Sequence, residues 1–416
     1  MAVGLRAVWP LFLGVLLMQL GHGLGGSLVS VQATAQNFTT TTTGLVMAGF
    51  YLGMFVSSIV SPPIISNVGH IRAFAAFASL VSTAVLLIPL WPDPIWWFLM
   101  RVIIGICIAG LAIVVESWLN AASSNEDRGK MLSIYMIVAY AASGAGSLLL
   151  NIGDTSGFVR FIVVSALLSL ALVPISLANV QAPAIGIPRR VSLWDVFTIS
   201  PLAFVGTFAA GLGQSAFFSM GPVYGLANNL SLVEVSIMMA LPPLALLLSQ
   251  YPVGSLSDRF DRRIVMTILT FVTTGVALFA LFNPSSNAIV IIITMTVFGA
   301  ISFPIYSLCL AHANDYLEAD QMLGASAKLV LIYGAGAICG PIVVGFAMHF
   351  AGPIGYMTFL AFVHGALGFY ALSRMFARPE TPDETSEYIT IAPQSTPVVA
   401  QVIAEEYEEQ SPTIPE

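Results

Sequence analysis

The chain has 416 residues, of which 57% are hydrophobic and only 8% are charged, and its mean hydropathy is +0.90. This composition excludes a soluble globular protein and a disordered chain, and it predicts a polytopic membrane protein. The net charge of −7 says little about partners, because nine of the 21 acids follow Arg378 and leave 12 acids against 14 bases before them.

Twelve apolar runs are each long enough, at about 20 residues, to cross a bilayer as a helix. In chain order they cover residues 7–31, 44–65, 73–90, 95–121, 131–152, 158–178, 199–226, 233–253, 264–282, 288–311, 322–348 and 354–376. The predicted fold class is an all-α membrane protein with twelve transmembrane helices. An even number of spans places both termini on one side, which also holds eleven of the 14 lysines and arginines. Because basic residues concentrate in cytoplasmic loops, we expect both termini to be cytoplasmic.

A short charged stretch, Gly254-Ser-Leu-Ser-Asp-Arg-Phe-Asp-Arg-Arg263, lies between the eighth and ninth runs. Five charges in ten positions are too costly to place in hydrocarbon, so the stretch predicts a tight loop at a membrane surface. A degraded copy lies 192 residues earlier, where Ser66 and Asn67 replace the acid and the arginine. The charged loop is therefore expected to occur twice in the fold.

Other sequence matches keep nearly the same offset and indicate an internal repeat. The matched segments are Leu20-Gly-His22 with Leu212-Gly-Gln214, Asn37-Phe-Thr39 with Asn229-Leu-Ser231, and Met131-Leu132 with Met322-Leu323. We expect Thr39 and Ser231 to be helix N-caps, although both segments also have the N-glycosylation pattern. The repeat predicts two six-helix halves, residues 1–178 and 199–378, joined by a cytoplasmic linker at 179–198. Residues 379–416 are acidic and too polar to span, and they predict a disordered cytoplasmic tail.

The pattern Gly254-x-x-x-Asp258-Arg259-x-x-Arg262-Arg263 resembles the loop signature of the major facilitator superfamily, with Asp261 where the family usually has a second glycine. The twelve-helix layout, with this loop repeated between the second and third helix of each half, resembles the same family. The resemblance implies two parallel six-helix halves around a site near the membrane midplane. It also implies a monomeric bacterial transporter of a small-molecule substrate, located in the cell inner (plasma) membrane.

The sequence carries no motif for covalent chemistry, for a metal site or for nucleotide binding. We therefore expect no enzyme activity, no cofactor, no metal ion and no nucleic-acid partner, and the chain is not expected to be an ATP-driven pump. Function is then carried by polar groups inside the bilayer, where a charge costs from ~3 kcal/mol upward.

Two such charges, Arg101 and Glu116, lie within the fourth run. Fifteen residues apart on one helix, they share a face but are ~22 Å apart, too far to pair. Arg101-Val-Ile-Ile-Gly105 resembles the family's fourth-helix motif, whose arginine is associated with proton-coupled exchange. Two alternatives stay open. The first is that Arg101 forms a local ion pair or a hydrogen bond that locks helices together. The second is that the Glu116 side chain snorkels to water at the membrane surface.

The first run carries Gln19 and His22 on one helix face, and Gln214 is the repeat counterpart of His22 in the seventh run. The resemblance implies that these two helices line the central cavity. The three polar groups, with Arg101 and Glu116, are therefore candidates for contact with substrate or a coupling proton. The alternative is a hydrogen bond between packed helices, which the glycine-rich stretch at 21–26 also favours.

The charged loop supplies three gating candidates, Asp258, Arg259 and Arg262. We expect the Asp258 carboxylate to stabilise a helix N-terminus of the other half, near Met131. The two arginines are expected to bind carboxylates or lipid phosphates. This arrangement predicts a clasp that holds the inner side closed.

The eleventh run supplies the other gating candidates, Lys328, Gly340 and Pro341. Gly340-Pro341 resembles a glycine-proline motif of facilitator antiporters and predicts a bend in the helix. Lys328 lies at a depth matching that of Glu116, in the opposite half. The resemblance implies that these two helix ends converge when the inner side closes, and the two charges are then expected to pair. The alternative is that Lys328 binds lipid phosphate while Glu116 pairs with Arg128 or Lys130.

These observations favour a secondary active transporter that moves a small solute by alternating access, with protons as a candidate coupling ion. A proton-driven multidrug efflux antiporter is the alternative within transport. A membrane receptor or scaffold that does not transport is the alternative from another class.

Overall fold

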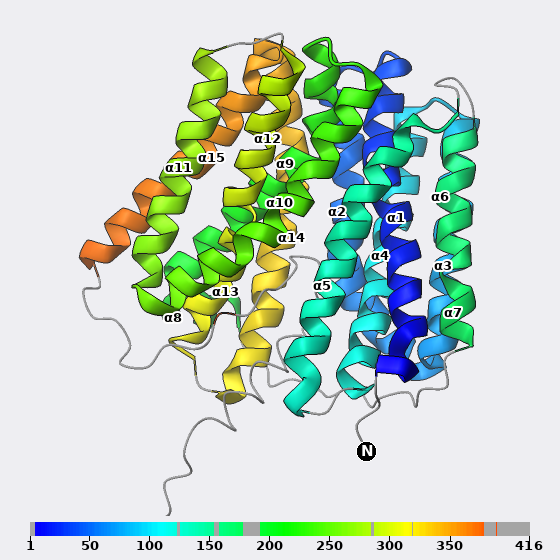
Figure 1. The fold of residues 1–416 in the computed structure, drawn as a ribbon, viewed down its shortest axis with the longest axis horizontal. Helices are drawn as coiled ribbons and strands as arrows, with labels where there is room; N and C mark the ends of the chain where they lie inside the picture. Colours follow the sequence, from blue (N-terminus) through cyan, green and yellow to red (C-terminus); the bar gives the residue numbers. More distant parts are fainter. Residues whose placement is uncertain are drawn as a thin grey trace, which may run out of the picture.

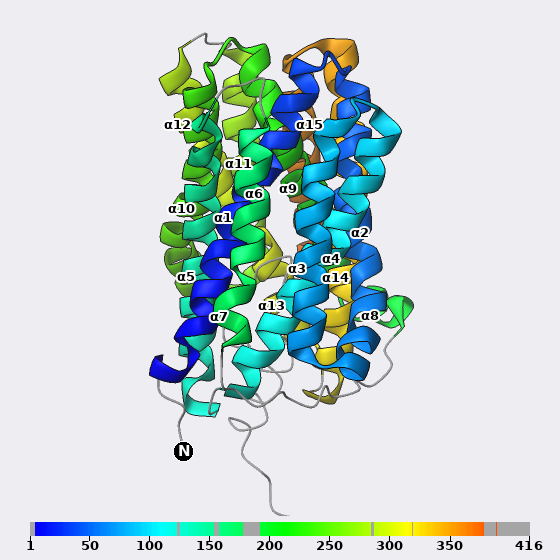
Figure 2. The same cartoon turned by 90° about the vertical axis from the view of Figure 1, so that its right-hand side faces the viewer.

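The computed structural model describes residues 5–122, 125–153, 158–177, 192–283, 287–317, 319–377 and 388. Within these residues, twelve helical segments are long and apolar enough to span a membrane, which confirms the predicted number and class. They form two bundles that stand side by side, with the chain's first helix starting at the lower end (Figures 1 and 2). The terms upper and lower end refer below to the orientation of Figure 1.

The first bundle contains six spans. Its helices are α1 (Leu5–Ala35), α2 (Thr40–Val68), α3 (His70–Leu87) with the 3-10 turn η1 (Ile88–Leu90), α4 (Pro94–Ala122), α5 (Asn125–Leu148) with η2 (Leu149–Asn151), α6 (Val159–Leu170) and α7 (Leu172–Ser176). The second bundle follows the short helix α8 (Leu193–Ile199) and also contains six spans. Its helices are α9 (Pro201–Ala227), α10 (Leu232–Arg259), α11 (Arg262–Phe282), α12 (Ala288–Ser302), α13 (Ile305–Asn314), α14 (Ala319–Ala351) and α15 (Ile354–Ala377).

Two spans that the sequence shows as single runs are each built from two helices. The sixth span breaks at Ala171, ahead of Pro174, and the tenth breaks at Phe303, next to Pro304. Proline lacks an N–H group and its ring clashes with the carbonyl four residues earlier, so a helix is interrupted just before it. The spans still cross the membrane, and the breaks place irregular backbone inside the bundles.

The predicted N-caps at Thr39 and Ser231 are confirmed. The Thr39 hydroxyl accepts a hydrogen bond from the backbone N–H of Thr42, and Ser231 forms a capping box with Glu234. The asparagines two residues ahead of these caps both have positive φ angles, 59° and 63°. The same turn therefore occurs at equivalent places in the two bundles, as the internal repeat predicts.

The predicted linker and tail lie mostly outside the described residues. The end of the linker is helical, because Ser192 caps α8 by accepting the N–H of Asp195 and donating its own N–H to that carboxylate. Those hydrogen bonds from Ser192 hold the pKa of Asp195 below its usual value. In the tail only Tyr388 is described.

The two bundles contact each other through α2 with α14 and through α5 with α10. At the upper end, Thr40 donates a hydrogen bond to the Gly345 carbonyl (3.0 Å), and Asn151 donates one to the Ser236 hydroxyl (2.7 Å). Gly44 fits directly against the Pro341 carbonyl, where a Cβ atom has no room. These contacts hold the upper ends of the bundles together.

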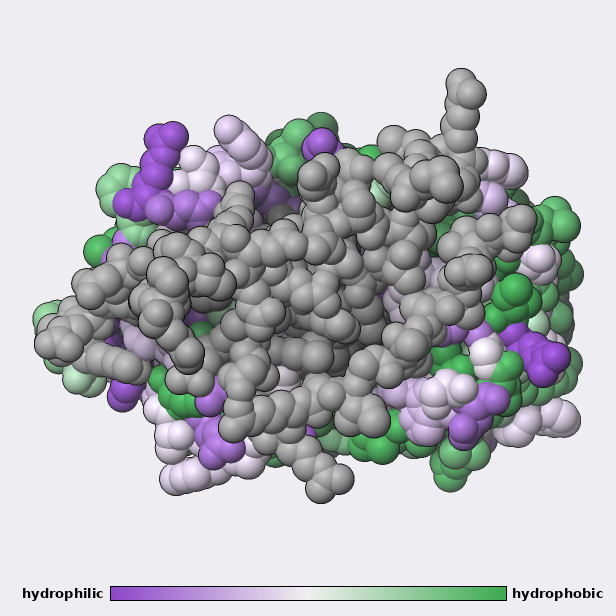
Figure 3. Space-filling view, turned by 90° about the horizontal axis from the view of Figure 1, so that it is seen from below, coloured by the Kyte–Doolittle hydropathy of each residue, from purple (hydrophilic) through white to green (hydrophobic). Residues whose placement is uncertain are grey.

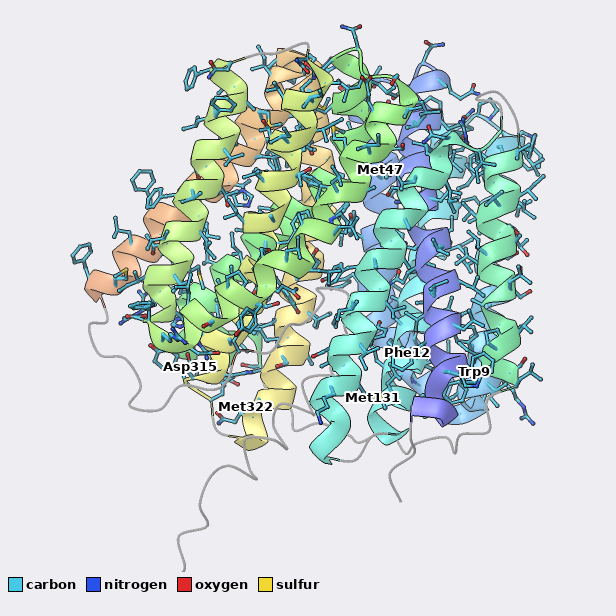
Figure 4. The ribbon with its side chains drawn as sticks, in the orientation of Figure 1. Trp9, Phe12, Met47, Met131, Asp315 and Met322 are labelled. Carbon is cyan, nitrogen blue, oxygen red and sulfur yellow. The ribbon has the colours of Figure 1, made fainter. Side chains whose placement is uncertain are left out.

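The lower ends of the bundles are arranged differently. Below its crossing with α5, α10 leans away toward the lower left of Figure 1. Met131 of α5 and Met322 of α14, which the repeat makes equivalent, both lie at this end (Figure 4). Seen from below, patches of hydrophilic and hydrophobic residues alternate around the rim of the molecule (Figure 3). The structure therefore has a closed upper end and separated lower ends of α5 and α10.

Candidate functional site

A cavity lies where the two bundles meet, with about 110 Å³ of space for water. Its walls come from α1, α2, α4 and α5 of the first bundle and from α9, α10 and the α12–α13 break of the second. All five residues that the sequence singles out for substrate or proton contact line it: Gln19, His22, Arg101, Glu116 and Gln214. The geometry brings them together in one space, and their role in binding stays a prediction.

Arg101 is a buried cation with no counter-ion among the residues that the structure describes. Its side chain comes from α4 and is 5% exposed, and its Nε atom has no hydrogen-bond partner in the described part of the chain. The guanidinium lies 4.7 Å from the ring centre of Phe50, and His22 stacks on the same ring at 5.4 Å. Three helices thus build one stack of His22, Phe50 and Arg101. A local ion pair, which the sequence left open for Arg101, is absent among the described residues.

Glycines explain how α2 and α4 come close enough to form this stack. A Cβ atom added to Gly53 would overlap the backbone of α4, and one added to Gly105 would overlap the backbone of α2. Close contact of the two helices is therefore possible only with glycine at these positions. A Cβ atom added to Gly49 would press on Phe98 and on the Cβ atom of Arg101, so α2 and α4 are also in close contact beside the arginine.

Glu116 is buried rather than turned toward the membrane surface, so the snorkelling alternative is wrong. Its side chain is 3% exposed and accepts a hydrogen bond from the Tyr135 hydroxyl of α5 at 3.0 Å. Lys328 forms no ion pair with any described residue, so the expected pair with Glu116 is not formed in this conformation. Pairing stays a prediction for a state in which the lower ends meet. Of the two alternative partners, Arg128 has its side chain outside the described residues, and Lys130 is exposed at the start of α5, so pairing of Glu116 with either residue stays a prediction.

Gln214 lines the cavity and also joins helices. Its Nε2 atom donates to the Phe303 carbonyl at the α12–α13 break (3.2 Å), and its Oε1 atom accepts from the Tyr333 hydroxyl of α14 (3.0 Å). The sequence offered packing and cavity lining as alternatives, and the structure shows both at once. A substitution at Gln214 would therefore alter packing as well as the cavity wall.

Helix α1 both packs closely and lines the cavity. A Cβ atom at Gly23 would overlap the Ser143 carbonyl of α5, and one at Gly21 would press on Leu168 of α6. Gln19, His22 and Gly23 all line the cavity. Close packing and cavity lining therefore occur on the same helix, and contact of Gln19 and His22 with a substrate stays a prediction.

The cavity is chemically uneven. The first bundle supplies its charged and ionisable groups, whereas the second supplies mainly apolar and aromatic side chains. The second bundle's main contributions are Phe218, Met239, Pro243, Leu246 and Phe303. Sequence reasoning missed Phe50 and Tyr135, because an aromatic residue in an apolar helix gives no local signal of which way it points.

Comparison with known proteins shows the family. The sequence pattern of the Major Facilitator Superfamily matches residues 11–233 and 203–402. The chain belongs to the Major Facilitator Superfamily. An uncharacterized MFS-type transporter of Yersinia enterocolitica is 25% identical over 346 residues, which cover 83% of this chain and 89% of the relative. The similar protein YcaD of Escherichia fergusonii is 24% identical over 348 residues, covering 82% of this chain and 88% of the relative.

Solved structures agree on the fold. The crystal structure of the nucleoside transporter NupG matches with a TM-score of 0.72 and 14% identity, over 90% of this chain and all of the other. A bacterial homologue of the human lysosomal transporter Spinster, in an inward-facing and unoccupied conformation, matches with a TM-score of 0.68 and 12% identity over 98% of each chain. The chain is thus a multi-pass membrane protein of the major facilitator fold, and the family supports secondary transport.

The charged loop between α10 and α11 forms its ion pairs within the second bundle. Arg262 is buried and donates to the carboxylate of Asp315, at the end of α13 (3.0 Å), and more weakly to Asp258 (3.5 Å). Asp261 caps α11 by accepting the N–H of Arg263 and also pairs with that guanidinium at 2.7 Å. Burial raises the pKa of Asp261, but the hydrogen bonds and charge of Arg263 outweigh it and leave the pKa below its usual value.

The expected partner of Asp258 is not the one seen in this conformation. Instead of a helix N-terminus near Met131, its carboxylate accepts the backbone N–H of Tyr388 at 3.0 Å. The carboxylate contact expected for Arg262 is confirmed, whereas Arg259 is exposed. A gating role for the loop stays a prediction that concerns a different state.

The glycine and proline of α14 lie at the junction of the bundles. Gly340 packs against Ser215 and Leu212 of α9, while the Pro341 carbonyl meets Gly44 of α2. The helix continues through Pro341, from Ala319 to Ala351. In this conformation the pair therefore serves close packing at the upper end, and its role in gating stays a prediction.

Proposed function

We propose that the chain is a secondary active transporter that moves a small solute by alternating access of the cavity to the two membrane faces. The observation that carries this proposal is the position of Arg101, a buried cation that lines the cavity between the two bundles. A buried charge without a partner is costly, so such a charge is typical of a site that a ligand completes. The contacts of Thr40 and Asn151 support a state in which the upper face is shut.

The proposed setting follows from the distribution of charge. We place the lower end, at which α1 begins and which holds the charged loop between α10 and α11, in the cytoplasm of a bacterial cell, with the protein a monomer in the inner membrane. The closed upper end then makes this an inward-open state. Labelling of single cysteines in intact cells and in inverted vesicles would test the orientation.

The cavity has ionisable groups on the side of the first bundle and mainly apolar groups on the side of the second, and this distribution supports one class of substrate. Arg101 and His22 favour a carboxylate or another acceptor group at the first bundle. Phe218, Met239 and Phe303 favour an apolar or planar body at the second. The proposed substrate is therefore a small amphipathic solute with an acidic or strongly accepting end. Thermal stabilisation by a panel of such compounds would identify it, and flux into liposomes would separate a transporter from a receptor that only binds.

Flexible methionines give some support to multidrug efflux as a second candidate. Met18, Met47, Met54 and Met239 line the cavity, and unbranched thioether side chains adapt to different ligands. A cavity built this way tolerates several apolar shapes. Stabilisation by one chemical series favours a dedicated transporter, whereas stabilisation by many unrelated apolar cations favours efflux.

Proton coupling is proposed to run through Glu116. Glu116→Gln keeps an oxygen that accepts from Tyr135, so the variant is expected to fold while losing the ability to bind and release a proton. Accumulation driven by a pH gradient should disappear in liposomes, while exchange of labelled for unlabelled solute continues. Glu234→Gln, at a helix cap outside the cavity, is the matched control and should transport normally. Gradient-driven accumulation that survives Glu116→Gln would remove the residue from coupling.

A further inference from the structure

A second pocket lies in the lower part of the second bundle, apart from the central cavity. Its walls come from the junction of α8 with α9 and from α11, α13 and α15, and its lining residues are all different from those of the central cavity. Tyr316, which follows Asp315 at the lower end (Figure 4), is one of them. The pocket has only about 20 Å³ of space for water, which is room for the end of a ligand and not for a whole solute.

The hydroxyl group of Ser200, a residue that lines this pocket, has no hydrogen-bond partner in the described part of the chain. The residue is 2% exposed, so the group is shielded from bulk water. Ser200 is the N-cap of α9, where a serine hydroxyl usually accepts a helix N–H, but no such bond forms here. Because buried polar groups are normally paired, this hydroxyl indicates that a ligand completes the site.

Arg374 brings an uncompensated positive charge to the pocket. It lies in the last turn of α15, is half-buried, and forms no ion pair with any residue that the structure describes. Arg263 also lines the pocket, but its charge is balanced by Asp261 at 2.7 Å. The N-terminus of α9, a helix of 27 residues, adds the positive end of its dipole at Ser200. The pocket therefore suits a negatively charged hydrogen-bond acceptor.

Helix α8 places the pocket at the level of lipid head groups. It projects from the side of the molecule in its lower part (Figure 2), and its residues Leu193 and Trp194 are 49% and 69% exposed. The ring of Phe197 contacts that of Phe204 and so packs α8 against α9. An exposed tryptophan beside the end of a span is typical of the interface between hydrocarbon and water. The anion nearest to such a pocket in a membrane is a lipid phosphate.

We propose that this pocket binds the phosphate group of an anionic membrane lipid. Arg374 and the Ser200 hydroxyl donate hydrogen bonds to the phosphate oxygens, and the acyl chains lie beside the exposed apolar residues of α8. With the lower end in the cytoplasm, as proposed above, the pocket faces a leaflet that carries anionic lipids. A bound lipid then ties the end of α15 to the junction of α8 and α9. The proposal goes beyond transport, because the pocket lies outside the central cavity.

Titration with a short-chain lipid tests the site. The full chain in detergent is titrated with dioctanoyl-phosphatidylglycerol, and the rise in melting temperature gives an apparent Kd. Arg374→Gln should raise that Kd about tenfold and Ser200→Ala about threefold, since a charge-assisted hydrogen bond is worth more than a neutral one. Neither variant should lower the melting temperature of the lipid-free protein, because neither side chain has a partner among the described residues. Arg72→Gln, at an exposed arginine in the first turn of α3, is the matched control and should leave the Kd unchanged.

Two further ligands separate the sources of the phosphate group. Inorganic phosphate lacks acyl chains, and dioctanoyl-phosphatidylcholine carries its own compensating cation, so each should bind about tenfold more weakly than the anionic lipid. Displacement of the anionic lipid by inorganic phosphate at equal concentration would mean that the pocket takes a free anion. Equal binding of the two lipids would mean that it does not recognise net negative charge. Either result, or a Kd that Arg374→Gln and Arg72→Gln change alike, would overturn the proposal.

Discussion

Replacing Arg101 by methionine is expected to abolish transport without weakening the fold. The variant removes a buried cation that the described structure leaves without a counter-ion, while keeping an unbranched side chain on Phe50. Losing a charge-assisted contact with the substrate should lower its affinity by about 100-fold, since each 1.4 kcal/mol is tenfold in Kd. The free energy of unfolding should stay the same or rise, because burying an unpaired charge is costly.

The measurement for Arg101→Met is a pair of titrations. Thermal stabilisation by an acidic ligand should shift to about 100-fold higher concentration, while the melting temperature of the ligand-free protein does not fall. Arg101→Lys keeps the charge but not the forked donor geometry, and it should fall between the parent and methionine. A large loss of stability in the ligand-free Arg101→Met protein would mean that the arginine is a structural lock.

Replacing Arg262 by methionine is expected to lower the stability of the fold, unlike the same substitution at Arg101. Arg262 is as deeply buried as Arg101, but it is hydrogen-bonded to the carboxylate of Asp315, whose side chain is 3% exposed. Arg262→Met would break this buried ion pair, which typically costs about 3–5 kcal/mol. The protein should therefore melt at a clearly lower temperature.

A double variant shows whether the pair itself is responsible. Arg262→Met combined with Asp315→Asn removes both charges, so a large part of the stability lost in the single variant should return. Additive losses in the double variant would argue that the two residues act independently. The contrast between the two buried arginines then separates a group that binds a ligand from one that holds the helices together.

The fold and the contents of the cavity were predictable because both leave strong patterns. Twelve apolar runs and a repeat of about 192 residues specify the spans and their pairing. Burial of a charge in hydrocarbon is costly enough to mark Arg101 and Glu116 as unusual. The resemblance of the first and seventh helices to cavity-lining helices then placed His22 and Gln214 in the same space, with both lining the cavity in the structure.

The partners of the charged residues could not be predicted, because they depend on which conformation the chain adopts. Asp258 was expected on the opposite bundle, but in this conformation its carboxylate accepts the backbone N–H of Tyr388. Glu116 was expected with Lys328 and is hydrogen-bonded to Tyr135 instead. The break at Pro304 was also missed, since hydropathy measures length and composition but not helix continuity.

The central claim is that one cavity is open at the lower end and shut at the upper end, and that the bundles exchange these states. The direct test places single cysteines at His22 and Gln214, in a chain without native cysteines, and adds a membrane-impermeant thiol reagent to either side of oriented vesicles. The parent should react faster from the lower side than from the upper side. Adding Gly44→Val, which forces α2 away from the Pro341 carbonyl, should speed the reaction of both cysteines from the upper side. Cysteines that are inert from both sides, or that react in the parent faster from the upper side than from the lower, would contradict the account.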